Sequence, residues 1–178
     1  MLKKFFAAII LGACITALNS FVMVDTCSAE IAKSELSLGG VTGWSRRDDV
    51  RRMYGKPDWK NEWESEWRYG NSVSVGFQEG VVSSVTSTAN NGWATPAGLT
   101  VGMNISTALN LYGDPDRSKT KDNKTLYIYF VNYLDGGEGH LGILFDKNSK
   151  KISKLNIFKS HMADFREYYS GWETNMFK

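Results

Sequence analysis

One segment of this sequence recurs. Residues 53–58 read Met-Tyr-Gly-Lys-Pro-Asp, and residues 111–116 read Leu-Tyr-Gly-Asp-Pro-Asp, 58 positions later. Three strand-like runs follow each copy, so the two halves are expected to share one architecture. The chain is therefore predicted to be α+β, with two tandem repeats that each pack a short helical segment on a three- to four-stranded antiparallel meander sheet.

A short helix is predicted before each motif. Ser45 can cap the first helix with Asp48 in the third position, and Asn104 is the expected cap of the second. Glycine then supplies the left-handed residue that ends a helix, and proline prevents the helix from resuming. The residues predicted to face inward are Val50, Met53 and Tyr54 in the first helix and Ile105, Ala108, Leu109 and Tyr112 in the second. The motif residues are Tyr54, Gly55 and Pro57 in the first copy and Tyr112, Gly113 and Pro115 in the second.

Alternation of apolar and polar residues predicts the strands. Residues 59–69 are predicted to form one strand, although tryptophans spaced i, i+4, i+8 also fit a helix; Gly70-Asn71 favours a hairpin. The other strands are expected at 73–77 and 81–88 in the first copy, and at 125–133, 140–145 and 151–158 in the second. Residues 89–92 and 95–98 have the composition of a linker. A last helix is expected at 160–171, with Met162, Phe165 and Tyr169 inward.

The N-terminal residues 1–29 have the features of a signal peptide. Lys3-Lys4 precedes the apolar run 5–18, and small residues at 26–29 predict cleavage before Glu30. The protein is thus expected to be exported, either secreted or in the cell envelope. An uncleaved anchor is one alternative, since apolar character continues through 21–24. A lipoprotein is the other, because Leu11-Gly12-Ala13-Cys14 resembles a lipobox, with Cys14 as the lipidated residue.

The rest of the chain is divided into repeats at 30–92 and 93–159 and a C-terminal helical tail at 160–178. Both cysteines, Cys14 and Cys27, precede residue 30, so the mature chain has no thiol for a disulfide, a metal or a nucleophile. The formal charge is +2, from 21 basic and 19 acidic residues, and it becomes +1 without residues 1–29, which hold two lysines and one aspartate. Such a balance gives no electrostatic reason to expect nucleic acid as a partner. The basic face of Arg46, Arg47, Arg51 and Arg52 is interpreted as a solvated helix face.

Catalytic and metal-binding patterns are weak in this sequence. The histidines are His140 and His161, and neither lies beside a serine in a nucleophile pattern. Asp135, Glu138, His140 and Asp146 offer oxygen and nitrogen ligands, but their spacing fits no known metal loop, and a solvated hairpin is the expected role. The chain is therefore predicted to be non-enzymatic, without a metal or a cofactor.

Aromatic residues, 13% of the chain, are the most suggestive feature for function. Large rigid rings dominate binding hot spots, and strand 126–131 is apolar on both faces, so one face is expected to look away from the helices. Protein binding through an aromatic sheet face is the first prediction. An envelope carbohydrate-binding module is the alternative, and a hydrolase without a recognisable motif is the third choice. The candidate binding residues are Trp59, Trp63, Trp67 and Tyr69 in the first copy and Tyr127, Tyr129 and Tyr133 in the second.

The order of elements resembles the β-lactamase-inhibitor-protein-like superfamily, whose single-repeat members include outer-membrane assembly lipoproteins of the SmpA/OmlA type. The resemblance covers about residues 38–158 and rests on Gly55-Lys56-Pro57, Gly113-Asp114-Pro115 and the strands after them. It implies an antiparallel sheet with helices on one side and a concave other side that holds a protein partner, as in an inhibitor or an assembly factor. The tandem inhibitor has a disulfide in each repeat and this mature chain has no cysteine, so the resemblance extends to the fold and not to β-lactamase inhibition.

Overall fold

The computed structural model describes residues 31–132, 138–160 and 172–178. The predicted signal peptide, the alternative lipidation at Cys14, Tyr133, and residues 161–171 of the predicted last helix lie outside these ranges. Ser160, which was predicted to begin that helix, instead ends a strand. Within the described ranges, no helix combines the length and apolar character that a membrane crossing requires.

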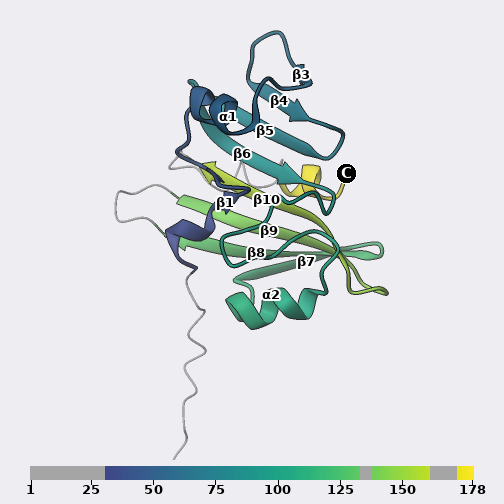
Figure 1. Ribbon diagram of the computed structural model, residues 1–178. Helices are drawn as coiled ribbons and strands as arrows, with labels where there is room; N and C mark the ends of the chain where they lie inside the picture. The colour runs from purple at the N-terminus through teal and green to yellow at the C-terminus, as the bar shows by residue number, and fades with distance from the viewer. Residues whose placement is uncertain (1–30, 133–137, 161–171) are drawn as a thin grey trace, which may run out of the picture.

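The fold is α+β and is built on a large antiparallel sheet with few helices (Figure 1). In the described residues, eight strands form this sheet in the order β3-β4-β5-β6-β10-β9-β8-β7, and a separate pair, β1 and β2, lies beside it. The helical elements are η1 (Lys33–Glu35), α1 (Arg47–Tyr54) and α2 (Ile105–Tyr112), and residues 172–176 of the predicted C-terminal tail are helical as well. The strands are β1 (Ser37–Leu38), β2 (Val41–Thr42), β3 (Trp59–Lys60), β4 (Glu66–Tyr69), β5 (Val73–Gln78), β6 (Val81–Ser87), β7 (Arg117–Lys121), β8 (Lys124–Asn132), β9 (Glu138–Asp146) and β10 (Ile152–Ser160).

Helix α2 forms as its sequence predicts. The Asn104 side chain accepts a hydrogen bond from the Ser106 backbone N–H at 2.9 Å, which satisfies one of the unpaired donors at the helix start. Ile105, Ala108 and Tyr112 are buried, so the predicted apolar stripe faces the core.

Helix α1 differs from its prediction at both ends. Its N-cap is Arg46, whose backbone N–H donates to the Asp49 carboxylate at 3.0 Å, whereas the Ser45 hydroxyl accepts from the Thr42 N–H. Val50 is buried, but Met53 is 47% exposed. Tyr54 is partly exposed, and its ring stacks on Trp93 with centroids 4.2 Å apart. The stripe predicted for this helix is therefore reduced to one buried residue.

Residues 59–69 form a hairpin, and the prediction of a single strand is wrong. Strands β3 and β4 pair antiparallel, and the chain reverses between them because Asn61 exchanges two hydrogen bonds with Glu66, at 3.1 Å each. Glu64 adopts a left-handed φ of 51° in this turn. The apolar alternation simply continues through the reversal, so it does not reveal where the strand ends.

The seam between β6 and β10 joins the two halves of the sheet. These strands pair antiparallel, with Val85 opposite Ile157. Each half contributes four strands in sequence order, and each set follows one of the two α-helices. The seam lies in the middle of the sheet, so the sheet has its open edges at β3 and β7.

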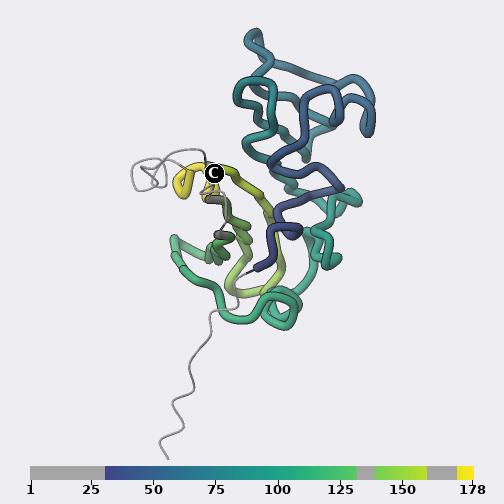
Figure 2. The backbone as a smooth tube through the Cα atoms, turned by 90° about the vertical axis from the view of Figure 1, so that its left-hand side faces the viewer, coloured from purple at the N-terminus to yellow at the C-terminus, as the bar shows by residue number. Residues whose placement is uncertain are grey.

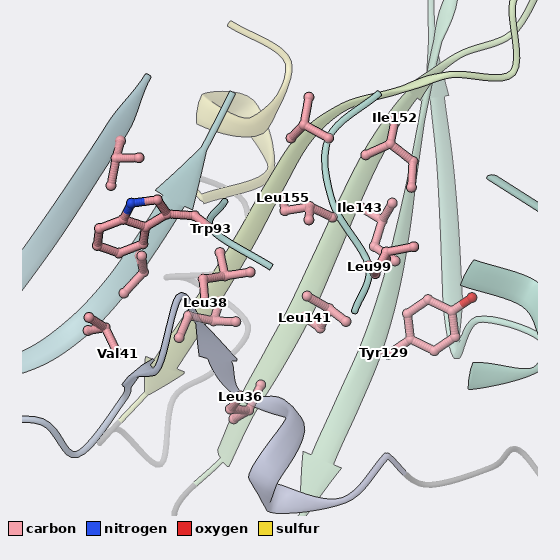
Figure 3. Packing of buried hydrophobic residues seen from close by; sticks show 14 of the residues in the cluster. Leu36, Leu38, Val41, Trp93, Leu99, Tyr129, Leu141, Ile143, Ile152 and Leu155 are labelled. Atoms are coloured by element: carbon pink, nitrogen blue, oxygen red, sulfur yellow. The ribbon is translucent and has the colours of Figure 1, made fainter. Parts of the chain in front are cut away.

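The main core lies on the helix side of the sheet. Leu36, Leu38 and Val41 from the N-terminal segment pack over the strands together with Trp93 and Leu99 (Figure 3). Thr95, placed in a linker by composition, is also buried, and its hydroxyl lies 2.7 Å from that of Tyr112. The segment between the two sets of strands is thus part of the core, because it has to cover apolar strand residues that the short helices leave open.

A second, smaller core lies on the opposite side. Leu126, Ile128 and Leu144 pack there against Trp172 and Met176 from residues 172–178. Figure 2 shows the curved sheet with the N-terminal segment on one side and the C-terminal residues on the other. One face of strand 126–131 does look away from the helices, as expected, but it meets neither a partner nor the other repeat, because Trp172 and Met176 of the chain's own C-terminal segment cover it.

The same contacts close the turn after each helix. In both places a tyrosine hydroxyl donates to the carbonyl of the helix-ending glycine, and an aspartate accepts the N–H of the residue after that tyrosine. The hydroxyl bonds are Tyr69 to Gly55 at 3.2 Å and Tyr129 to Gly113 at 3.0 Å; the aspartate bonds are Gly70 to Asp58 at 2.6 Å and Phe130 to Asp116 at 2.7 Å. Gly55 and Gly113 have φ values of 78° and 71°, which an L side chain rarely adopts.

Candidate functional site

A hollow of about 1010 Å³ opens on the sheet face opposite the helices, over β4, β5, β6 and β10. We call it the open hollow. Its floor follows from the strand register, because Ser74 lies opposite Thr86 and Thr86 lies opposite Asn156. The valines that alternate with these residues point to the main core. The floor residues are Ser74, Gly76, Ser84, Thr86 and Asn156.

The floor is low because its side chains are small. Gly76 lies opposite Ser84, and a Cβ atom at Gly76 would come within 2.5 Å of the Ser84 hydroxyl. None of the floor side chains carries a charge. A partner that enters the hollow therefore meets mainly hydroxyl groups, at little desolvation cost compared with buried charges.

The outer wall of the open hollow is formed by Ser65, Glu66 and Arg68, and the edge strand β3 pairs with β4 just outside it. Arg68 and Glu66 form an ion pair with Nε and Oε1 2.9 Å apart. The Arg68 guanidinium also lies over the Trp59 ring, 4.4 Å from its centroid. Trp59 is directly opposite Arg68 in the ladder and is 45% exposed, so the rim carries a charged pair and a large aromatic surface side by side.

The inner wall consists of residues from the C-terminal segment 172–178. Trp172 Nε1 donates to Asn156 Oδ1 at 2.8 Å, and the Asn156 amide donates to Thr86 Oγ1 at 2.8 Å. Lys154 donates to the carbonyls of Asn175 and Met176 at 3.3 and 3.0 Å. The wall is therefore tied to the floor by hydrogen bonds, and not only by apolar contact.

Gly142 on β9 makes room for this wall, and the substitution Gly142→Ala tests the fit. A Cβ atom there would lie 2.7 Å from Trp172 Cζ2, so the rigid indole has to move. We expect a loss of about 1–3 kcal/mol in the free energy of unfolding, measured by urea denaturation. In the background of Trp172→Leu the same change should cost at least 1 kcal/mol less, as a double-mutant cycle measures. Equal costs in both backgrounds would show that Trp172 does not pack on Gly142.

The predicted aromatic residues do not form one face. Trp67 and Tyr129 are fully buried on the helix side, so the prediction that they bind a partner is wrong. The alternation correctly predicted that each of them lies on the apolar face of its strand, but that face packs against the main core. Tyr69 and Tyr127 are half-buried against the same core. Burial raises the pKa of Tyr129, and its phenol stays neutral.

The two remaining tryptophans of the prediction are exposed. Trp59 stands at the rim of the open hollow, as described above, and stays a candidate binding residue. Trp63 lies in the β3–β4 turn and is 80% exposed. Arg47 fixes this turn to α1, because its guanidinium donates to the Glu64 carbonyl at 2.9 Å.

The floor of the open hollow was not predicted. Its residues are the polar half of the alternation in 73–77 and 81–88, a pattern that by default indicates a solvated strand face. The signal that was available is the size of these residues: serine, glycine and threonine leave a hollow where longer polar side chains would fill it. Trp172 was also missed, because nothing in the sequence around it indicates which strand of the sheet it packs against.

His140 is buried and not in a solvated hairpin. It is 1% exposed, stacks on Phe158 and meets Trp172 edge-on, with ring centroids 5.2 and 4.0 Å away. Burial lowers the pKa of His140 to about 3, so the imidazole is neutral at physiological pH. Among the other ligands considered, Asp135 lies outside the described residues and Asp146 accepts N–H groups of its own turn. The described residues contain no group of three His, Cys, Asp or Glu side chains placed to hold a metal ion.

Comparison with known proteins gives little. No protein-family model matches this chain, and no curated protein matches it significantly. One solved structure, an extracellular protein containing an SCP domain from Bacillus anthracis strain Ames, superposes with a TM-score of 0.45 and 11% sequence identity. The superposition covers 65% of this chain and 43% of that protein, so this chain spans less than half of that protein's length. A likeness of this size establishes neither a common fold nor a shared function.

Proposed function

We propose that this protein is an exported, non-enzymatic binding module that holds another protein in the open hollow. The observation that carries the proposal is the hollow itself, an open part of the sheet face whose floor consists of small or uncharged side chains. Catalytic chemistry is not needed to explain such a floor. His140, a general-base candidate by residue type, is enclosed by aromatic rings and has no exposed surface to offer a substrate.

The rim residues favour a protein as the partner. Trp59 offers exposed aromatic surface at low entropic cost, and Glu66 and Arg68 beside it supply both signs of charge. Aromatic and arginine side chains are enriched at the energetic centres of protein interfaces. A low floor between two walls also fits an extended chain or a loop better than it fits a flat surface.

The proposal includes an origin by duplication, with each copy consisting of one helix and four strands. Support comes from the recurring Tyr-Gly-x-Pro-Asp motif and from the pairs of equivalent hydrogen bonds. In each copy these bonds tie the glycine and the last aspartate of the motif to the second strand that follows it, β4 in the first copy and β8 in the second. A likeness to the β-lactamase-inhibitor-protein-like superfamily is part of this proposal, because helices on one side and an open opposite side are what that resemblance implies. In this chain the C-terminal residues occupy half of that side.

Export is likewise part of the proposal and rests on the predicted signal at residues 1–29. Secretion, an envelope location, a lipid anchor at Cys14 and an uncleaved anchor all place the open hollow outside the cytoplasm. Fractionation of the producing cells with an antibody to the chain, together with the mass of the exported form, distinguishes them.

The substitution Ser74→Tyr tests the site. A tyrosine on the floor of β5 projects into the hollow and blocks part of it without disfavouring the strand, so capture of the partner from envelope extracts should fall at least tenfold. Ser118→Tyr is the matched control, because it makes the same change on the exposed edge strand β7. Trp59→Ala should also weaken capture, at unchanged stability. If Ser74→Tyr folds and captures every partner at the wild-type level, the open hollow is not the binding site.

A polysaccharide of the envelope is the second candidate, favoured by the hydroxyl groups of the floor and by Phe158 beside them. Sugars bind by stacking on such rings while their hydroxyls hydrogen-bond to polar side chains. Adding purified envelope polysaccharide to the capture experiment separates the two. A protein partner remains bound, whereas direct binding of labelled polysaccharide that Ser74→Tyr abolishes would favour the second candidate.

A further inference from the structure

Two neighbouring turns of the sheet concentrate positive charge. The turn between β7 and β8 and the turn between β9 and β10 project together from one side of the molecule (Figure 1). Residues 121–124 and 146–151 contain five lysines and two aspartates. We call the lysines the basic corner; they are Lys121, Lys124, Lys147, Lys150 and Lys151.

The two turns are fixed to each other. The Lys147 backbone N–H donates to the Asn123 carbonyl at 2.8 Å, and the Asn123 side chain donates to the Asp146 carboxylate. Asp146 also accepts the N–H groups of Asn148 and Ser149 at 3.0 and 2.8 Å. These hydrogen bonds, that from Ser149 first, lower the pKa of Asp146, so it stays ionised and keeps both turns closed. The lysines therefore extend from a rigid base.

The charge of the basic corner is not neutralised within the described residues. Four of its lysines are exposed and Lys124 is half-buried, and the ion pairs of the described chain involve none of the five. Lys119 on the same hairpin, by contrast, pairs with Glu173. Burial, and after it the charge of Lys124, lowers the pKa of the neighbouring Lys154. A chain whose net charge is only +2 thus presents a local excess of three positive charges at one corner.

An exposed apolar side chain lies next to these charges. The Met103 carbonyl accepts the N–H of Ile152, and Asn104 bridges to Lys151, so the loop before α2 runs beside the β9–β10 turn. Met103 is 37% exposed. Lysines around an exposed methionine suit the boundary of a bilayer, where the ammonium groups meet lipid phosphates and the thioether enters the apolar region.

We infer that the basic corner docks this protein on a membrane surface rich in anionic phospholipid. Each lysine near such a surface is attracted to it, and the attraction falls off within a Debye length. A lysine side chain is a flexible point charge. It is therefore better suited to the mobile headgroups of a bilayer than to a fixed pattern of carboxylates on a protein partner. The inference goes beyond the sequence-based expectation that membrane contact runs only through the signal or a lipid anchor. It uses none of the residues assigned to partner binding.

The test measures partition of the full chain onto large vesicles of phosphatidylcholine alone or of phosphatidylcholine with phosphatidylglycerol. Lys147→Gln/Lys150→Gln should lower partition onto the anionic vesicles about 25-fold, at about fivefold per lysine. Partition onto neutral vesicles should stay the same. Residues 1–30 are identical in the variants, so their own lipid affinity cancels in the comparison. Added salt should reduce the difference between the two kinds of vesicle.

Arg52→Gln/Lys56→Gln is the matched control, since it removes two exposed cations at the end of α1. It should change partition less than twofold. As a local readout, acetylation of Lys147 and Lys150 should slow when the protein is on anionic vesicles, whereas that of Lys56 should not. Equal losses in the two double variants, absence of protection at Lys147 and Lys150, or binding to soluble polyphosphate without binding to anionic vesicles would each overturn the inference.

Discussion

Lowering the pH from 7 to 4 should cost the folded protein about 3 kcal/mol through His140 alone. The unfolded chain protonates this residue near its ordinary pKa of 6.5, whereas burial lowers the folded pKa to about 3. Between these values the unfolded state binds a proton that the folded state does not. The contribution of His140 to stability is therefore complete above pH 6.5 and is lost progressively as the pH falls toward 3.

Comparison with His140→Leu isolates this effect. Leucine has a similar volume and does not titrate, so it suits a site between Phe158 and Trp172. Urea denaturation at pH 7, 6, 5 and 4 should give a steeper fall for the wild type than for the variant, by about 3 kcal/mol over the series. Other groups that titrate, such as Asp146, contribute equally to both proteins. Parallel curves would mean that His140 is protonated or solvated in the folded state.

Trp67→Ala should lower the free energy of unfolding by about 3–5 kcal/mol, the usual cost of removing a fully buried large aromatic side chain. Its ring meets Phe77 edge-on at 4.9 Å, and the guanidinium of Arg51 lies 5.1 Å from its centroid. The cavity left by this substitution lies at the junction of α1 with β4 and β5. Equilibrium denaturation in urea gives the value directly.

Trp63→Ala is the matched control for Trp67→Ala. The two tryptophans have the same parity in the alternating segment, yet Trp63 is in the β3–β4 turn. Its loss should change stability by no more than about 0.5 kcal/mol. Similar destabilisation by the two substitutions would contradict the hairpin and support the single strand that the sequence pattern predicts.

Local elements of this fold follow from local sequence. The Asn104 cap, the stripe of α2, and the strands near 73–77, 81–88 and 140–145 form where capping chemistry and periodicity predict them. These features depend on hydrogen bonds and side-chain directions within a few residues, so the pattern contains the necessary information. The Asn61 turn depends on one side chain that bonds to the backbone five residues ahead, which alternation does not encode.

The candidate site was accessible to sequence analysis only in part. Trp59 was predicted as a binding residue from its type, and it stays a candidate because it is 45% exposed on the edge strand. The floor was not identified, because serine and threonine on the polar side of a strand ordinarily face water. What makes them a floor is the wall that Trp172 builds from the far end of the chain.

The sequence by itself determined the composition of the halves: a helix, a glycine turn and a set of strands, each with one side suited to burial. Which side is buried, and by what, was decided by the tertiary structure. Residues 172–178 close one half of the second face and leave the other half open, and the β6–β10 seam places both halves in one sheet. Periodicity predicts that one face of a strand is apolar. Whether that face is buried depends on the second surface that packs against it, and here that surface comes from distant segments of the chain.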